Sequence, residues 1–116
     1  MKLPWSPASN VALYGHTADI PAALDAGVLV ALAPDWSMGG SPNLLDELRV
    51  AKAWSDSHWA ARLSAKDLVL MVTSNAADVV AKGSLLGHLQ EGMLADITVF
   101  HGDTSAPYDA ILQASP

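Results

Sequence analysis

One stretch of the chain is apolar without interruption, and the segments on both sides of it follow a regular order. Residues 28–33 place six apolar side chains in a row, which is typical of a strand buried on both faces. A short amphipathic helix is expected over residues 19–26, with Gly27 in the left-handed conformation that closes many helices. A Gly-rich loop, residues 38–41, comes next and leads into another helix. This helix–strand–loop–helix order predicts a parallel α/β fold.

Signals for helix starts accompany this pattern. Thr17 is the expected N-cap of the helix over residues 19–26. Ser41 is the expected N-cap of a second helix, which has Pro42 in its first turn and runs to about residue 54. The charged side chains of this second helix are interpreted as a solvated face: Asp46, Glu47, Arg49 and Lys52. The helix is therefore expected to lie on a sheet with its leucines inward.

The carboxyl-terminal half contains further helix signals. Ser64 and Asp67 form an approximate capping box, which predicts a third helix with an apolar run at residues 68–72. Asn75 is expected to cap a short helix that ends near residue 81, and residues 108–112 are expected to form a helical turn. These helices would follow one another with short connections.

Four other segments read differently. Residues 3–5 are the expected tail of a strand, and residues 94–100 alternate over their last part as another strand would. Residues 6–16, which contain Pro7 and Asn10, and the polar link at residues 55–58 are expected to be irregular. The chain thus predicts few strands and several helices.

Composition narrows the class of protein. The chain has 116 residues, enough for one domain, and its 51% hydrophobic content and mean hydropathy of +0.25 indicate that part of its surface is covered by something else. A net charge of −6 argues against nucleic acid or an anionic membrane as a partner. The absence of cysteine excludes a thiolate metal site. No apolar run approaches the roughly 20 residues of a membrane helix, and no signal peptide is evident, so a cytoplasmic protein is expected.

Two groups of short motifs resemble a known family. The first comprises Trp-Ser-Pro-Ala-Ser-Asn at residues 5–10 and Ala-Pro-Asp-Trp-Ser at residues 33–37. The second comprises Gly-Ser-Leu at residues 83–85 and the run from Glu to Phe at residues 91–100. In this order they resemble the last third of the amidohydrolase superfamily, in particular its cytosine deaminase, guanine deaminase and triazine hydrolase branch.

The resemblance implies a fold larger than this chain. Relatives would be (β/α)8 TIM barrels that hydrolyse C–N or C–Cl bonds of ring or amide substrates with water activated by divalent zinc or iron. Residues 1–82 would be the last two β/α units of such a barrel, with residues 28–33 as its eighth strand. Residues 83–116 would begin the return into a small carboxyl-terminal β-sandwich.

The resemblance also assigns site residues. Asp35 would be the aspartate that ends the eighth strand, acting as a metal ligand and as the catalytic group that carries a proton to the leaving nitrogen. Trp36, Ser37 and Asn10 would line the substrate pocket at the barrel mouth. Local chemistry offers plainer alternatives: Asp35 and Asn10 suit turns, and Trp36 suits packing against a neighbouring loop.

The departures from the family pattern limit what this chain can do alone. The family's His-x-His pair is missing, and the four histidines match none of its ligand positions and are interpreted as surface residues. Two strands cannot close a barrel that needs eight. We therefore expect a carboxyl-terminal fragment that binds no metal and is inactive by itself, completed by a missing amino-terminal portion or by self-association. The alternative is a non-catalytic packing module, motivated by apolar faces of residues 28–33 and 68–72 that would lie uncovered.

Overall fold

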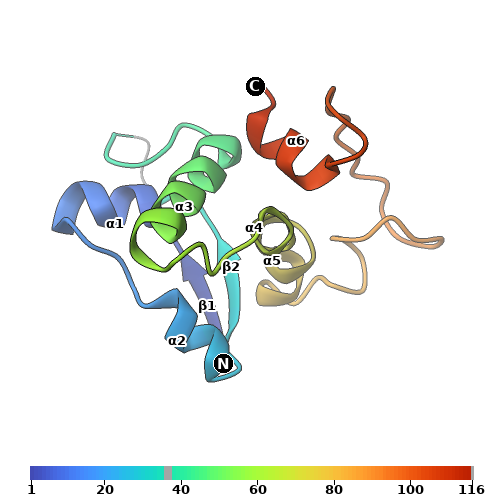
Figure 1. The fold of residues 1–116 in the computed structure, drawn as a ribbon. Coiled ribbons are helices and arrows are strands. Elements are labelled where there is room, and N and C mark those ends of the chain that lie inside the picture. Colours follow the sequence, from blue (N-terminus) through green and yellow to red (C-terminus); the bar gives the residue numbers. More distant parts are fainter. Residues whose placement is uncertain (36–37, 116) are drawn as a thin grey trace.

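The computed structural model describes residues 1–35 and 38–115, in which two strands lie side by side among six helices (Figure 1). The elements in chain order are β1 (Lys2–Trp5), α1 (Pro7–Tyr14), α2 (Ile20–Asp25), β2 (Leu29–Leu32), α3 (Leu44–His58), α4 (Ala65–Val72), α5 (Ser74–Val79) and α6 (Pro107–Gln113). The strands are parallel, with Trp5 opposite Leu32. The described chain is therefore a small mixed α/β domain. Both of its strands, β1 and β2, were predicted from the sequence.

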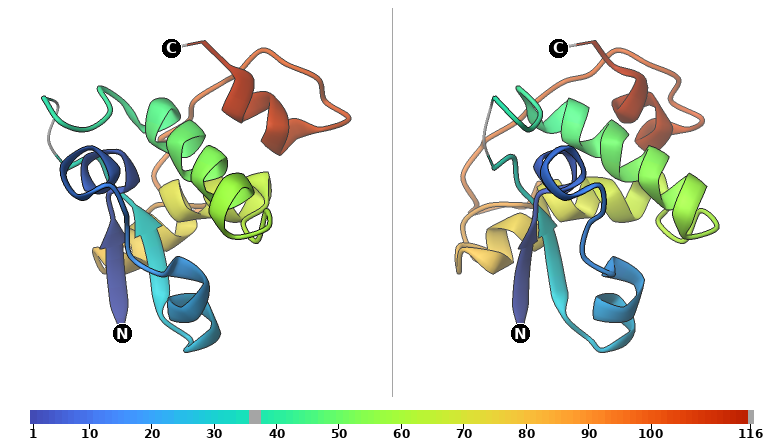
Figure 2. Two further views of the ribbon diagram at one scale, coloured as in Figure 1. Left: turned by 60° about the vertical axis from the view of Figure 1, so that its left-hand side comes forward. Right: turned by 90° about the vertical axis from the view of Figure 1, so that its left-hand side faces the viewer.

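The parallel pairing follows from the connection between the strands. A parallel neighbour requires the chain to cross back along the sheet, and α1 and α2 make that crossing (Figure 2). The Leu29 N–H donates to the Met1 carbonyl over 3.1 Å, and the Ala33 N–H donates to the Trp5 carbonyl over 2.9 Å. These bonds continue the ladder beyond both ends of β1 and β2. The carboxyl ends of the two strands consequently meet at one edge.

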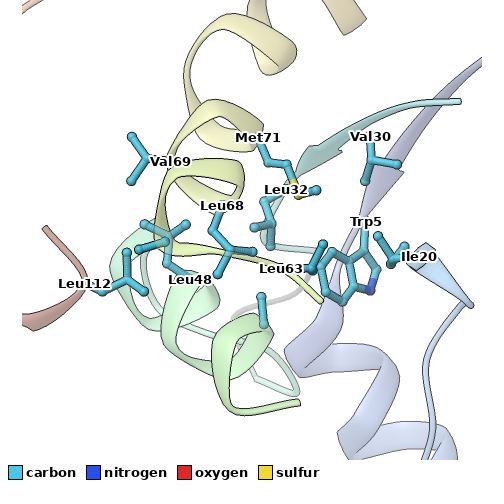
Figure 3. Close-up of a cluster of buried hydrophobic side chains, with 12 residues drawn as sticks. Trp5, Ile20, Val30, Leu32, Leu48, Leu63, Leu68, Val69, Met71 and Leu112 are labelled. Atoms are coloured by element: carbon cyan, nitrogen blue, oxygen red, sulfur yellow. The ribbon is translucent and has the colours of Figure 1, made fainter. Parts of the chain in front are cut away.

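A hydrophobic cluster joins the sheet to the helices, and Figure 3 shows side chains from the strands gathered with those of α4. Its buried members are Trp5, Ile20, Val30, Leu32, Leu48, Ala51, Leu63, Ala65, Leu68, Val69, Met71 and Leu112. Because α4 and α5 pack on β2, the apolar side chains of β2 and α4 lie largely inside the molecule. The expectation of uncovered apolar faces at residues 28–33 and 68–72 is therefore wrong.

Two segments expected to be irregular are helical instead. Most of residues 6–16 forms α1, with Pro7 in the first turn, where its missing N–H removes no helical hydrogen bond. Residues 55–58 continue α3, and Ser55 is buried, with its Oγ accepting a hydrogen bond from the Leu63 N–H over 2.9 Å. A buried donor outside the helix explains why a polar side chain is tolerated here, and this partner is too far along the chain for a local pattern to reveal.

The N-caps of α2 and α3 differ by two residues from those expected. Asp19, not Thr17, caps α2, and Asn43, not Ser41, caps α3; each side chain accepts a hydrogen bond from the N–H three residues further on. The Thr17 hydroxyl is occupied elsewhere, as described below. At the other end of α2, Gly27 has a φ of +73°, which confirms the left-handed position.

The start of α4 agrees with the sequence and the start of α5 does not. The predicted capping box of Ser64 and Asp67 is present, with both of its hydrogen bonds. Thr73 occupies the N-cap of α5, so Asn75 lies inside that helix. The Asn75 Nδ2 donates to the Val30 carbonyl of β2 over 2.9 Å. A contact distant in sequence therefore replaces the local capping role.

The predicted strand at residues 94–100 is wrong. This segment has no regular secondary structure, and the side chains of Ile97 and Val99 are exposed. Alternation alone does not make a strand, because the backbone N–H and C=O groups of a strand need a neighbouring strand. No such neighbour is found within residues 1–35 and 38–115.

The predicted helical turn near the carboxyl end is confirmed as α6. Leu112 of α6 is buried in the cluster shared with α3 and α4, and the Arg49 Nε donates to the Leu112 carbonyl over 2.9 Å. Placement of the chain in a (β/α)8 barrel, and its division at residues 82 and 83, stay predictions. In the described ranges, every helix is too short or too polar to cross a membrane.

Candidate functional site

Asp35 lies just beyond the carboxyl end of β2, exposed to solvent. The Ser9 hydroxyl donates a hydrogen bond to its Oδ2 over 3.2 Å. Ser9 is buried in α1, the helix that begins directly after β1. The two side chains thus come from the segments that follow neighbouring parallel strands, where ligand and catalytic sites of α/β proteins are usually found.

The hydrogen bond between Ser9 and Asp35 restrains the carboxylate. At 3.2 Å the bond is longer than the roughly 2.5–2.7 Å typical of a hydroxyl that donates to a carboxylate, so the restraint is weak. The Ser9 Oγ also lies 3.4 Å from the Ser6 carbonyl, a longer contact that competes for the same proton. The carboxylate is the better acceptor by charge and by distance. Asp35 is therefore an exposed carboxylate whose Oδ2 accepts a hydrogen bond from the Ser9 hydroxyl.

Asn10 takes part in a chain of polar contacts. The Trp5 Nε1 donates to the Thr17 Oγ1 over 2.7 Å, and the Thr17 hydroxyl donates to the Asn10 Oδ1 over 3.1 Å. This chain ties the segment after α1 to the end of β1. It gives Asn10 a side-chain partner rather than the backbone partner that turn chemistry would supply. A place for Asn10 in a substrate pocket stays a prediction.

The other two residues assigned to the pocket, Trp36 and Ser37, lie outside the described residues. The structure therefore describes only the residues on either side of them. Asp35 precedes them, and Gly39 and Gly40 are half-buried on the way back to α3.

The described residues do not by themselves fit a metal ion. Within residues 1–35 and 38–115, no three His, Asp or Glu side chains gather as a ligand group. All four histidines are exposed; His58 stacks on Trp54, with ring centroids 3.8 Å apart and planes 7° apart. Catalytic zinc usually takes about three protein ligands. Asp35 could supply one ligand, and the others would have to come from another segment.

The prediction that Glu47 belongs to a solvated helix face is wrong. It is completely buried, with its Oε2 accepting from the Ala8 N–H over 3.2 Å and its Oε1 accepting from the Ser41 N–H over 3.3 Å. A sequence signal was present, because Glu47 lies three residues after Leu44 and four before Ala51, on the apolar stripe of α3. The charge of Glu47 indicates a solvated residue, whereas its position along α3 indicates a buried one.

The fold and the position of Asp35 are typical of one class of α/β proteins. A parallel β/α unit with a carboxylate at the end of a strand is typical of enzymes that carry their chemistry at the carboxyl edge of the sheet. A family model described as "Amidohydrolase family" matches residues 3–115. The chain belongs to the amidohydrolase family, whose hydrolases act on C–N bonds. The resemblance to the amidohydrolase superfamily is thereby confirmed, and the cytosine deaminase, guanine deaminase and triazine hydrolase branch stays a prediction.

Curated relatives agree with this assignment. The chain is 30% identical over 100 residues to an imidazolonepropionase of Fusobacterium nucleatum, covering 86% of this chain and 23% of the relative. It is 39% identical over 103 residues to a 5-methylthioadenosine/S-adenosylhomocysteine deaminase of Haloquadratum walsbyi, covering 84% and 22%. An imidazolonepropionase of Chloroflexus aggregans is 36% identical over 88 residues, covering 76% and 20%. The chain thus spans less than a quarter of the length of each of these relatives.

Proposed function

We propose that the chain provides the last two β/α units of an amidohydrolase barrel and supplies the carboxylate that moves a proton during hydrolysis of a non-peptide C–N bond. The observation that carries this proposal is the position of Asp35 at the end of β2, held through Oδ2 by Ser9. Membership of the amidohydrolase family supports it.

The proton-transfer role follows from exposure and restraint together. A general base must lie within hydrogen-bond reach of the proton that it accepts and of the atom that receives it. Asp35 is open to solvent, and Ser9 engages Oδ2, so we assign the transfer to Oδ1. In this role Asp35 takes a proton from the attacking water and gives it to the departing nitrogen. The substrate class would be a small ring or amide compound.

Enzymes of this family generally use a divalent metal, and the proposed enzyme would use zinc or iron. Since the described residues do not form a ligand group, the histidine ligands would be supplied by the missing amino-terminal portion of the barrel or by self-association. The chain alone would then be inactive. A cytoplasmic location belongs to the same proposal.

The test is reconstitution of activity. The chain would be co-expressed with the preceding segment of an imidazolonepropionase or of a methylthioadenosine deaminase, and turnover of imidazolonepropionate or ammonia release from methylthioadenosine would be measured with zinc added. We expect turnover by the mixture and none by either part. Turnover by the purified chain alone would contradict the proposal.

Two variants assign the chemistry in the reconstituted enzyme. Asp35→Asn keeps the size of the side chain but removes the base, and should lower kcat by about 10²- to 10⁴-fold. Asp25→Asn is the matched control, because Asp25 is an exposed carboxylate at the end of α2 that pairs with Arg62 on the surface. Equal activity of the two variants would refute the role of Asp35.

A further inference from the structure

Glu47 is a completely buried carboxylate for which the proposed chemistry has no use. Burial of a charged group is costly unless hydrogen bonds satisfy it. Both of its oxygens are satisfied, and both donors are backbone N–H groups from other parts of the chain: Ala8 in α1 and Ser41 in the loop before α3. Glu47 therefore joins three segments at the carboxyl edge of the sheet.

The contact with Ala8 fixes the start of α1. The N–H groups in the first turn of a helix have no acceptor within the helix, and the N-cap residue of α1, Ser6, offers no side-chain hydrogen bond. Glu47 supplies the acceptor from α3, and its negative charge faces the positive end of the helix dipole. Ala8 is followed directly by Ser9, whose hydroxyl holds Asp35. The position of Ser9 is thus set one residue away from the Glu47 contact.

The second contact of Glu47 is with the Ser41 N–H, in the connection that precedes α3. Ser41 is buried and lies in the connection between β2 and α3, six residues after Asp35. The same carboxylate therefore contacts both the helix that carries Ser9 and the described part of the β2–α3 connection at Ser41. Because one rigid group makes both contacts, it sets the separation of the two segments.

We infer that Glu47 is a positioning residue, which keeps the Ser9 hydroxyl within hydrogen-bond distance of the Asp35 carboxylate. The inference rests on the proposed function only in treating Asp35 as the working carboxylate. It concerns the position of Asp35, which can be measured without turnover.

Glu47→Gln is the sharpest variant. A glutamine amide has the same size as the carboxylate but presents one acceptor oxygen and one donor NH2 group. One of the two backbone N–H groups, of Ala8 or Ser41, would then face a donor. Ser55→Ala is the matched control: Ser55 is also completely buried on α3 and accepts the Leu63 N–H over 2.9 Å, but it serves a different segment. Each variant leaves one buried N–H without its acceptor.

The experiment combines these variants with Ser9→Ala in NMR spectra of the 116-residue chain. In the parent chain, Ser9→Ala should move the carboxyl carbon resonance of Asp35, because it removes the hydrogen bond to Oδ2. When Ser9→Ala is added to Glu47→Gln, the Asp35 resonance should move little. When it is added to Ser55→Ala, the resonance should move as far as in the parent chain. Amide hydrogen exchange at Ala8 or Ser41 should be about tenfold faster or more in Glu47→Gln.

Several results would overturn the inference. Ser9→Ala could move the Asp35 resonance equally in the parent chain and in Glu47→Gln, or Ser55→Ala could abolish the effect as well. If Glu47→Gln does not fold, Glu47→Asp keeps the charge but is too short to reach both donors, and it should also uncouple Ser9 from Asp35. Failure of both Glu47 variants to fold while Ser55→Ala folds would assign Glu47 to general stability. An active Asp35→Asn enzyme would refute the proposed function and leave this coupling intact.

Discussion

The turn at Gly87 tests whether the irregular carboxyl-terminal segment is packed on the rest of the domain. Gly87 has a φ of +91°, and a Cβ placed there would lie 2.9 Å from the Ala77 Cβ and 2.9 Å from the Ser74 Cα, both in α5. Gly27 also has a positive φ, +73°, but a Cβ there would meet nothing within 4 Å. The pair Gly87→Ala and Gly27→Ala therefore differs mainly in the space available.

The expected difference can be worked out from these contacts. An alanine with positive φ costs about 1–2 kcal/mol at either position, and the loss of unfolded-state freedom offsets part of that cost equally in both variants. At Gly87 the added methyl group also has to displace the backbone of α5, and overpacking of this kind costs about 1–3 kcal/mol. Gly87→Ala should therefore be less stable than Gly27→Ala by about 1–3 kcal/mol.

The measurement is thermal unfolding followed by circular dichroism, with urea unfolding as a second measure of the free energy. For a chain of this length, 1 kcal/mol corresponds to about 4 °C in Tm, so Gly87→Ala should melt about 4–12 °C below Gly27→Ala. Equal melting temperatures would refute the reasoning, because they would mean that the Gly87 turn does not rest on α5.

Two further predictions concern the core and the surface. Leu68→Ala, in the centre of the cluster, should lower the free energy of unfolding by about 2–5 kcal/mol. Leu89→Ala, on the surface, should lower it by less than about 0.5 kcal/mol. Urea unfolding measures both losses, and similar values for the two variants would contradict the packing described. Two hydrogen bonds from Ser105 hold the pKa of Asp103 below its ordinary value of 3.8. The backbone N–H has the larger effect and the hydroxyl the smaller one. Ser105→Ala should raise that pKa in an NMR titration, and an unchanged pKa would refute the hydroxyl contact. Because the pKa is lowered by folding, the contribution of Asp103 to stability is present above 3.8 and fades as the pH falls through the lowered value.

Features that depend on neighbouring residues were predictable. Six consecutive apolar residues predicted β2, and the spacing of Ser64 and Asp67 predicted the start of α4. The position of Asp35 after the strand followed from the same pattern. In each case the physical cause lies within a few residues: burial of a strand on both faces, or satisfaction of the free N–H groups of a first helical turn.

Features that depend on distant partners were not predictable. Residues 94–100 alternate as a strand does, but a strand needs a neighbour, and its sequence does not say whether one is present. Glu47 looked solvated by its charge, and its two donors come from residues 39 positions before it and 6 positions before it. The hydrogen bond from Ser9 to Asp35 spans 26 positions. The position of Asp35 beyond the end of β2 could thus be predicted from the sequence, and its contact with Ser9 could not.

The edge of β2 that faces away from β1 bears on whether a larger sheet can form. The N–H groups of Leu29 and Ala33 point toward β1, so by the alternation of a strand the Val30 carbonyl faces the opposite edge. There it accepts the hydrogen bond from Asn75. A further strand on this side would either displace that side chain or pair beyond it. Displacement would cost about 1 kcal/mol, which a new ladder of several hydrogen bonds would more than offset.

The outer edge of β1 imposes a different condition. Because the Trp5 carbonyl accepts from β2, the adjacent Pro4 faces outward by the same alternation, and proline has no N–H to donate. A neighbouring strand on that side would lack one ladder bond at this position, while the carbonyl groups of the edge could still accept. Such a loss is again about 1 kcal/mol and small beside the burial of a whole strand. Neither of these hydrogen bonds therefore stands in the way of the neighbouring strands that the proposed barrel would add.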